Sequence, residues 1–587
     1  MIKEEKDKLI GDHHLPFKVT MKKVFHYIKP QWKRFLAAAI LIIINVILDV
    51  ILPLITGQVT NNLKKETIDI QVILFFVVSY LIISIINNIC LYFESMFLQK
   101  AGETIIYDLR VEVFKHIESM SINQFNEMSV GSLVTRVCNY TQSMSDLFTN
   151  VLVNVIKNLL TIFAVYGVML SISWRLSLTL LPIVILVFVL SYFFSKEGKK
   201  IFKRERAYIS EMNTFLNENL SGMKLIQIFN KENDKHEEFK EKNTRLWKNK
   251  YKLSLLFGLF RPAINLIYYS TIALTFYLGL KFTLNPGELV SFYLLLSKFF
   301  NPVQNLADQI NNLQKAFTSS ERLFNLLDVK PDVLDSKNAR DIDKFEGKIE
   351  FKNVWFAYND DNWILKDVSF KINPKESCAF VGATGAGKTT ILQLIVRNYE
   401  PQKGDIYIDD INIKDITISS LRKAIGQMLQ DVFLFSGSIK NNITLNNDKY
   451  SDEEIIETCK YVNASSFIER LPNQYNEEVM ESGSNLSSGE RQLLSFARVV
   501  ISKPQILILD EATSNIDTET ESLIQDSLKK ISTLGTMLVV AHRLSTIQHC
   551  TQIIVLQNGQ IIEKGNHQEL LKQKGFYYKL YKLQFEK

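Results

Sequence analysis

The stretch Gly382-Ala-Thr-Gly-Ala-Gly-Lys-Thr-Thr390 contains the residue types that hold the phosphate groups of a nucleotide. The apolar run Ser377–Val381 precedes it and the helical pattern Ile391–Val396 follows it, so the glycines lie in a turn between a strand and a helix. Glycines let backbone N–H groups wrap around phosphates, and a helix N-terminus favours an anion. We expect Lys388 to reach the β- and γ-phosphates and the Thr389 hydroxyl to ligate Mg²⁺. The alternative is a glycine turn that only caps a helix.

Two carboxylates end a second apolar run, Ile506-Leu-Ile-Leu-Asp-Glu511. In a parallel sheet the carboxyl ends of the strands meet at one edge, which is also where the phosphate loop begins. Asp510 therefore suits the Mg²⁺ side of the site, and Glu511 suits the orientation or deprotonation of the attacking water. The apolar run Thr536–Val540 leads to His542, which we expect at the same edge as a sensor of the γ-phosphate. Together these residues predict metal-assisted hydrolysis of a phosphoanhydride.

The elements that position these residues occupy only the second half of the chain. The protein has 587 residues, a net charge of +6, 47% hydrophobic residues and 38 Phe. Long uncharged apolar blocks fill the sequence up to about residue 315, whereas the remainder has the pattern of a soluble α/β protein. A small binding module and a purely soluble enzyme are thereby excluded. The five cysteines stand far apart without Cys-x-x-Cys spacing, so they indicate neither a zinc site nor a disulfide scaffold.

Six apolar windows in the first half of the sequence predict six transmembrane helices, because a helix needs roughly 20 apolar residues to span a membrane. The apolar windows are Phe35–Leu48, extended through Asp49 to Ile55, then Ile70–Phe93, Asn158–Trp174, Leu176–Ser195, Pro262–Leu280 and Leu289–Ala307. We expect spans two to five to continue as helices beyond the bilayer. Lys and Arg concentrate before Phe35 and in residues 196–252, which predicts cytosolic termini and cytosolic long loops. The basic and aromatic segment Met21–Trp32 predicts an amphipathic elbow on the inner membrane surface.

Polar residues inside two spans are candidate contacts for a transported molecule. Asp49 lies past the middle of the first span, with Asn45 one turn earlier on the same side. Because an intramembrane carboxylate faces a cavity or a partner, Asp49 contacts substrate, forms a structural pair or lies near the interface. In the sixth span one polar helical stripe predicts a surface that lines an aqueous space. The members of this stripe are Lys298, Asn301, Asn305 and Asp308.

These motifs resemble the ATP-binding cassette (ABC) family, specifically the exporter half-transporters that fuse a six-helix membrane domain to one nucleotide-binding domain. The resemblance covers nearly the whole chain and implies ATP and Mg²⁺ as cofactors. The implied ATP-binding residues are the adenine-stacking Tyr358, then Gly382, Ala383, Thr384, Gly385, Ala386, Gly387, Lys388, Thr389 and Thr390 of Walker A, and Gln430 of the Q-loop. The implied metal ligands are Thr389, Gln430 and Asp510, the implied catalytic residues are Glu511 and His542, and Asp517 closes the D-loop. Residues 131–136 and 221–229 look like the family's two intracellular-loop motifs near the coupling helices.

The signature segment departs from the family pattern. The family consensus is Leu-Ser-Gly-Gly-Gln, but here the third residue is Ser488 and the fifth is Glu490. In the family, two cassettes close head to tail, so that the signature of one chain faces the ATP on Walker A of the other. The residues that would do so here are Ser487, Ser488, Gly489 and Glu490. A Cβ at Ser488 crowds that approach, and the Glu490 carboxylate weakens the attraction for a phosphate anion.

The chain combines intact Lys388, Glu511 and His542 with an altered signature. This combination resembles one subunit of a bacterial heterodimeric multidrug exporter. Its partner would carry an intact signature and a degenerate Walker B, and a homodimer with two weak signatures is the alternative. The expected organisation is an elbow in residues 1–33, a membrane domain in 34–325, a linker in 326–347 and a cytosolic α/β nucleotide-binding domain in 348–587. The expected function is ATP-driven export of amphipathic compounds across the cell membrane. The expected partners are the second subunit, the lipid bilayer and the amphipathic substrate, and we expect no nucleic acid. The alternatives are a dedicated lipid, peptide or siderophore exporter, and a nucleotide-gated channel or sensor built on the same scaffold.

Overall fold

The computed structural model describes residues 16–64, 69–358, 362–510, 518–540 and 547–585. The chain divides into two compact units. Unit 1 comprises Met1–Ser119 with Glu127–Lys330, and unit 2 comprises Met120–Asn126 with Pro331–Lys587. Each unit has its own hydrophobic core, made by helices in unit 1 and by two sheets with their helices in unit 2.

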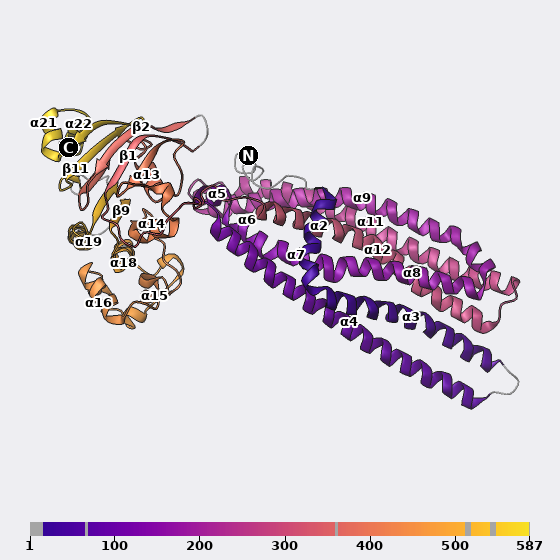
Figure 1. The fold of residues 1–587 in the computed structure, drawn as a ribbon. Coiled ribbons are helices and arrows are strands. Elements are labelled where there is room, and N and C mark those ends of the chain that lie inside the picture. Colours follow the sequence, from indigo (N-terminus) through magenta and orange to yellow (C-terminus); the bar gives the residue numbers. More distant parts are fainter. Residues whose placement is uncertain (1–15, 65–68, 359–361, 511–517, 541–546, 586–587) are drawn as a thin grey trace. The chain divides into compact units, whose positions relative to one another are not determined.

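Unit 1 is built around long helices (Figure 1). These are α3 (Trp32–Leu63), α4 (Ile70–Ser119), α8 (Leu152–Ile172), α9 (Trp174–Ser221), α11 (Glu232–Lys281) and α12 (Pro286–Leu327). Shorter helices are α2 (Phe17–Ile28), α6 (Val130–Thr135), α7 (Thr141–Asp146) and α10 (Met223–Ile228), with a 3-10 turn at Lys29–Gln31 and π-helical turns at Arg136–Tyr140 and Leu147–Val151. At 1.5 Å per residue, a helix of 50 residues such as α4 is about 75 Å long, well beyond a hydrocarbon core of ~30 Å. The expected continuation of the spans beyond the bilayer is therefore confirmed for α4, α9 and α11.

Five helical stretches among the described residues are long and apolar enough to cross a membrane, where six were expected. They are Lys18–Leu63, Ile70–Ser119, Val130–Ile172, Trp174–Ser221 and Glu232–Lys281. Helix α12 is not among them, because its apolar run is interrupted by Lys298 and the polar stripe that follows. Its apolar residues Phe292 and Leu295 are instead fully buried against the other helices of unit 1. Helix α12 therefore belongs to the helical bundle through packing rather than through overall hydropathy.

Small residues allow α3 and α12 to approach each other closely. A Cβ on Gly287 would lie 2.0 Å from the Gly57 carbonyl oxygen, so no larger side chain fits there. The Gly287 N–H donates to Asn61 Oδ1 at 2.8 Å, and Ser291 Oγ donates to the Pro53 carbonyl at 3.0 Å. Small residues and interhelical hydrogen bonds are typical of helix packing in membranes.

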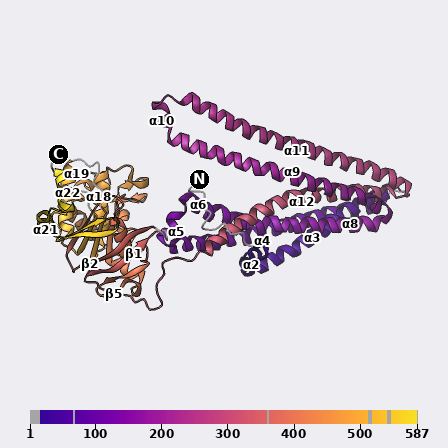
Figure 2. The same ribbon diagram turned by 90° about the horizontal axis from the view of Figure 1, so that it is seen from above.

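Helices α9 and α11 form a hairpin joined at its tip by α10 (Figure 2). They pack along each other, and in Figure 2 the α10 end of the hairpin stands apart from α8 and α12. The tip exposes apolar side chains, with Leu220, Leu225, Ile228 and Phe229 each more than 60% accessible. Such a contiguous exposed apolar group is typical of a surface that binds a partner.

Unit 2 contains two sheets. The smaller sheet has the order β2-β1-β4-β5 and is antiparallel, with β1 (Ile349–Ala357), β2 (Trp363–Ile372), β4 (Lys403–Ile408) and β5 (Ile411–Asn412). The larger sheet has the order β12-β11-β3-β10-β9-β6. Its strands are β3 (Ser377–Val381), β6 (Ile425–Met428), β9 (Ile506–Asp510), β10 (Thr536–Val540), β11 (Gln552–Gln557) and β12 (Gln560–Gly565). All neighbouring strands in the larger sheet are parallel except the β11–β12 pair, so most carboxyl ends meet at one edge.

The strands β3, β9 and β10 are almost completely buried, as expected for a parallel sheet covered on both faces. The helices of unit 2 are α5 (Ile122–Glu127), which the unit boundary crosses, α13 (Lys388–Ile395), α14 (Ile418–Ala424), α15 (Ile439–Thr444), α16 (Asp452–Tyr461), α17 (Ser465–Ile468), α18 (Ser488–Ile501), α19 (Thr518–Ile531), α21 (His567–Gln573) and α22 (Phe576–Phe585). Short 3-10 turns occupy Ile413–Asp415, Gln474–Asn476 and Glu481–Gly483, and a two-stranded sheet joins β7 (Gly437–Ser438) to β8 (Glu478–Val479).

The segment between α12 and β1 packs on unit 2. The Ile342 N–H donates to Ser420 Oγ at 2.9 Å, and the Phe345 side chain is buried in the core of that unit. Asp332 accepts a hydrogen bond of 2.9 Å from Gln124 Nε2 of α5. The boundary between the two units falls after Lys330, inside the expected linker.

Candidate nucleotide-binding site

The glycine loop lies between β3 and α13, as the sequence predicts. Gly387 is the N-cap of α13 and has φ +100°, a backbone conformation that favours glycine. A Cβ on Gly387 would lie 2.6 Å from Leu365 Cδ2, and one on Gly382 would lie 2.3 Å from the Leu556 carbonyl oxygen. The first and last positions of the loop are therefore restricted to glycine by close packing as well as by backbone geometry.

Lys388 is buried, whereas Ala383, Thr384, Gly385 and the neighbouring Thr389 are exposed. Its ammonium group donates to the carbonyl oxygens of Gly382 at 2.7 Å and Ala383 at 3.0 Å. Burial lowers the pKa of Lys388, and the negative charge of Asp510 acts against that shift. The lysine is thus held inside the turn of the loop, within the electrostatic reach of Asp510.

The carboxyl ends of four strands converge at this loop. In the register of the sheet, Val540 of β10 lies opposite both Asp510 of β9 and Phe380 of β3. Met428 of β6 lies opposite Leu509, so that Gln430 follows its strand beside the end of β9. The oxygen-bearing side chains of Thr389, Gln430 and Asp510 therefore come from segments that end at one edge of the sheet.

Oxygen donors of this kind suit Mg²⁺, which usually binds proteins through one or two carboxylates plus phosphate oxygens. Among the described residues there is no group of three or more His, Cys, Asp or Glu side chains that holds a metal by itself. The donor set of Thr389, Gln430 and Asp510 thus fits a magnesium ion that is shared with nucleotide phosphates.

Tyr358 lies beside the start of α13. Its hydroxyl and Thr390 Oγ1 are 3.2 Å apart, and its ring packs edge-on against Phe356 and Tyr399. The side chain remains 41% exposed, so one side of the ring is accessible. The ring is therefore oriented by its neighbours next to the glycine loop, where an adenine base can stack on it.

The signature residues begin α18. Ser487 is the N-cap, and Ser488 and Gly489 form the first turn. Ser487 Oγ accepts a hydrogen bond from the Glu490 N–H at 3.2 Å, and Glu490 Oε2 accepts one from the Ser487 N–H at 2.7 Å. This pair is a capping box. Among the described residues, no hydrogen bond joins it to the glycine loop.

Three further predicted residues lie outside the described residues: Glu511, Asp517 and His542. Their strands are described, and β9 and β10 end directly before Glu511 and two residues before His542. Their assignment to the nucleotide site stays a prediction.

The predicted substrate residues of unit 1 include an ion pair. Lys298 Nζ lies 2.6 Å from Asp49 Oδ1, and Asn87 Nδ2 lies 3.5 Å from the same oxygen. Asn301 and Asn305 are exposed on α12, and the side chain of Asp308 lies outside the described residues. Asp49 and Lys298 thus form a charge-compensated pair between α3 and α12, one of the alternatives left open by the sequence.

A second ion pair in unit 1 was not identified from the sequence. Glu94 of α4 is 95% buried and accepts hydrogen bonds from Lys157 Nζ at 2.9 and 3.1 Å and from Asn45 Nδ2 at 2.5 Å. The apolar windows that predicted the spans stop at Phe93 and begin at Asn158, one residue from each of these charges. An ionisable residue at the edge of an apolar window is the sequence signal that would have found this pair.

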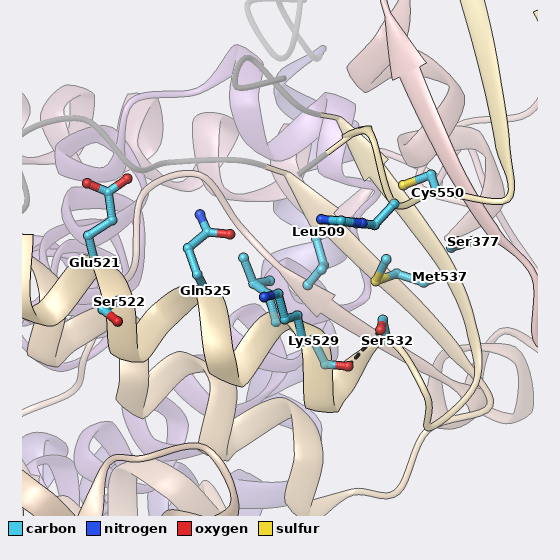
Figure 3. A pocket seen from close by; sticks show the side chains of 11 residues that line it. Ser377, Leu509, Glu521, Ser522, Gln525, Lys529, Ser532, Met537 and Cys550 are labelled. Atoms are coloured by element: carbon cyan, nitrogen blue, oxygen red, sulfur yellow. Dashed lines mark hydrogen bonds between the residues drawn. The ribbon is translucent and has the colours of Figure 1, made fainter. Parts of the chain in front are cut away.

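A separate pocket in unit 2 lies against α19 (Figure 3). It has a volume of about 490 Å³, and its lining includes Gln525 and Lys529 of α19, Met537 of β10 and Cys550. Ser377, the first residue of β3, also lines it, whereas the glycine loop follows the last residue of that strand. Burial raises the pKa of Cys550 to about 11, so its thiol stays protonated at neutral pH. This pocket is therefore distinct from the glycine loop and contains no reactive thiolate.

Comparisons with known proteins agree with this geometry. The family described as ABC transporter transmembrane region matches residues 35–303, and the family described as ABC transporter matches residues 365–514. An uncharacterized ABC transporter ATP-binding protein of Bacillus subtilis is 36% identical over 97% of this chain and 95% of its own length. A probable multidrug resistance ABC transporter ATP-binding/permease protein of the same species is 36% identical over 84% of this chain and 74% of its own length.

A lipid flippase and a solved exporter structure are also similar to this chain. An ATP-dependent lipid A-core flippase of Syntrophus aciditrophicus is 31% identical over 96% of this chain and 94% of its own length. The structure of a bacterial Atm1-family ABC exporter with ATP bound has a TM-score of 0.79 and 25% identity, and covers 94% of this chain and 98% of that one.

Fold and site together define a membrane-integral protein with an ATP-binding domain. The chain belongs to the ABC transporter family and has the exporter arrangement, in which the membrane region precedes a single nucleotide-binding domain. The ABC domain implies ATPase activity.

Proposed function

We propose that this chain is one subunit of a heterodimeric exporter that couples ATP hydrolysis to the movement of amphipathic or lipophilic compounds across the cell membrane. The observation that carries this proposal is a contrast between two parts of unit 2. The glycine loop, Lys388 and Asp510 are arranged for phosphate and metal, whereas the signature serine is engaged in a capping box with Glu490. A partner with an unmodified signature would complete the site over this chain's Walker motifs.

In this proposal Lys388 holds the β- and γ-phosphates, Tyr358 stacks on adenine, and Thr389, Gln430 and Asp510 hold Mg²⁺. When bound, Mg²⁺ would neutralise charge on the transferred phosphoryl group. Glu511 orients or deprotonates the attacking water, and His542 senses the γ-phosphate. The strand register supports this assignment because it brings the preceding segments to a common edge.

The exposed tip of the α9–α11 hairpin supports a dimer. The tip places Leu225, Ile228 and Phe229 in solvent, which is unfavourable for a protein without a partner. We propose that this tip docks on the partner subunit, and that both termini and unit 2 are cytosolic. The concentration of Lys and Arg in residues 196–252, which include this tip, supports the proposed orientation.

The cargo proposal is supported by the surface of α4. Two shallow, open depressions lie along the surface of this helix and share Tyr92. The larger one combines Tyr92, Met96 and Tyr107 with Lys100 and Glu103. Aromatic and aliphatic lining with a few charged groups suits amphipathic molecules. Because Lys298 neutralises Asp49, any preference of these helices for cationic cargo should be mild.

The test uses the full chain with a tag, isolated from its own membranes so that the native partner is retained. The isolated complex should contain a second, homologous subunit, and its ATPase activity should exceed that of the chain purified alone. Reconstituted vesicles should transport a lipophilic cationic dye with ATP, and Asp49→Asn should weaken transport without lowering basal hydrolysis. A homodimer of known mass with robust dye-stimulated ATPase would overturn the heterodimer, and transport of lipid alone would favour a flippase.

A further inference from the structure

The pocket against α19 combines an uncharged floor with a polar rim (Figure 3). The floor is formed by the sheet, where Leu509 and Met537 are 2% and 6% exposed. Cys550 adds a thiol that stays protonated at neutral pH, because burial raises its pKa to about 11. The volume of about 490 Å³ lies within the range of small-molecule sites in proteins. The floor therefore offers apolar surface, without a charge, to a small molecule.

Lys529 supplies a positive charge at the rim of this pocket. Its side chain is exposed, and within the part of the chain that the structure describes it makes no ion pair. Asp526, one turn earlier on α19, is already held by the Lys530 ammonium group at 2.6 Å and by Asn463 Nδ2 at 2.8 Å. The Lys529 ammonium group is thus available to a ligand of opposite charge.

Two features that repel an anion are weakened at the Lys529 end of the pocket. Glu521 also lines the pocket, but it lies two turns before Lys529, about 12 Å along the helix axis. This separation exceeds the Debye length of ~8 Å at physiological salt. The negative end of the helix dipole is also partly satisfied. Ser532 donates its N–H to the Leu528 carbonyl at 3.0 Å and its hydroxyl to the Lys529 carbonyl at 2.8 Å.

We propose that this pocket binds a small amphipathic carboxylate, with its apolar body against Leu509 and Met537 and its carboxylate against Lys529. Gln525 at the rim donates a further hydrogen bond to the carboxylate. The site is separate from the glycine loop, because it is lined by Ser377 at the start of β3, whereas the loop follows the end of that strand. The pocket is therefore independent of the proposed function and of its cargo.

The experiment observes para-trifluoromethylbenzoate by fluorine NMR in the presence of the full chain, purified with its native partner in lipid nanodiscs. This probe joins an aromatic body to one carboxylate. Binding should broaden its fluorine resonance with a dissociation constant of about 1 mM or lower, as expected for a ligand of this size. The neutral para-trifluoromethylbenzamide should bind about two- to fivefold more weakly, because the charge of Lys529 is exposed to solvent. Empty nanodiscs give the background from lipid.

Three variants of α19 test the position of the probe. Lys529→Gln should weaken benzoate binding about two- to fivefold and leave benzamide binding unchanged. Lys530→Gln is the matched control, because it removes the next lysine of the same helix, which does not line the pocket. It should change neither affinity. Gln525→Trp should fill the pocket with an indole ring and abolish binding of both probes.

Four results would overturn the site. They are no benzoate binding by the wild type, benzoate binding that survives Gln525→Trp, equal weakening by Lys529→Gln and Lys530→Gln, and displacement of the benzoate by AMP-PNP with Mg²⁺. Benzamide binding as tight as benzoate binding would overturn the carboxylate as the ligand class. If Gln525→Trp does not fold, the comparison of Lys529→Gln with Lys530→Gln decides. None of these results affects the proposed ATPase, which depends on the glycine loop.

Discussion

Replacing Glu94 by glutamine should reveal how strongly the buried ion pair stabilises unit 1. Glu94 is 5% exposed and receives hydrogen bonds from Lys157 and Asn45. Glutamine has nearly the same volume and keeps an oxygen for Asn45, but it leaves the Lys157 ammonium group without its counter-ion. The substitution therefore tests the charge with little change in packing.

The magnitude follows from the geometry. Two unit charges about 3 Å apart attract each other by roughly 5 kcal/mol at an effective dielectric constant of 20. Removing one partner of a buried pair costs about 3–5 kcal/mol, because the other charge stays buried. Because the Lys157 side chain is 24% exposed, we expect the free energy of unfolding to fall by about 3 kcal/mol, the lower end of this range. The side chains of Asp49 and Lys298 are 30% and 43% exposed, so they are less enclosed by protein than Glu94, and the loss of Asp49 should destabilise unit 1 less than the loss of Glu94.

The assay is the thermal midpoint of the full chain purified in detergent, followed by fluorescence-detected size exclusion. Glu94→Gln should lower the midpoint by about 5 °C or more, and Asp49→Asn should lower it less. The double variant Glu94→Gln with Lys157→Met should recover much of the loss, because it leaves no unpaired charge. Equal shifts for the two pairs, or strictly additive losses in the double variant, would refute the reasoning.

Three further predictions concern the nucleotide site. Tyr358→Ala should raise the KM for ATP about tenfold with a smaller change in kcat, since base stacking is about equal in ground and transition states; steady-state ATPase measurements check this, and an unchanged KM with a collapsed kcat would contradict it. Burial lowers the pKa of Lys388 from its ordinary value of 10.5, so its ammonium group loses its proton at a lower pH than that of an ordinary lysine. Because the neutral amine binds phosphate less well, the KM for ATP should rise at alkaline pH. Lys388→Arg should remove this alkaline rise, because arginine keeps its charge. Glu511→Gln should retain ATP binding and reduce turnover by about 10²- to 10⁴-fold, and near-normal activity of the assembled transporter would assign hydrolysis to the other site.

Features that depend on a few neighbouring residues were predictable. The boundaries of β3 and the glycine loop follow from local spacing, since glycine backbone geometry and strand burial are local properties. The start of α18 was also predictable from local sequence, because Ser487-x-x-Glu490 has capping-box spacing. The sequence analysis, however, considered only the charge of Glu490. The position of Asp510 at the phosphate edge also followed, since parallel strands end together.

Contacts between distant helices were decided only by the tertiary structure. Asp49 meets Lys298 across 249 positions, and Glu94 meets Lys157 across 63. The almost uniformly apolar spans carry no periodic pattern that defines which face of each helix is turned toward its neighbour, so rotation and register remain open in the sequence. The sequence predicted a sixth span at Leu289–Ala307, which lies within α12, but the burial of this helix depends on its packing against α3, α8 and α11. Local motifs thus determined the chemistry of the nucleotide site, whereas helix packing determined which charges in the membrane half are neutralised.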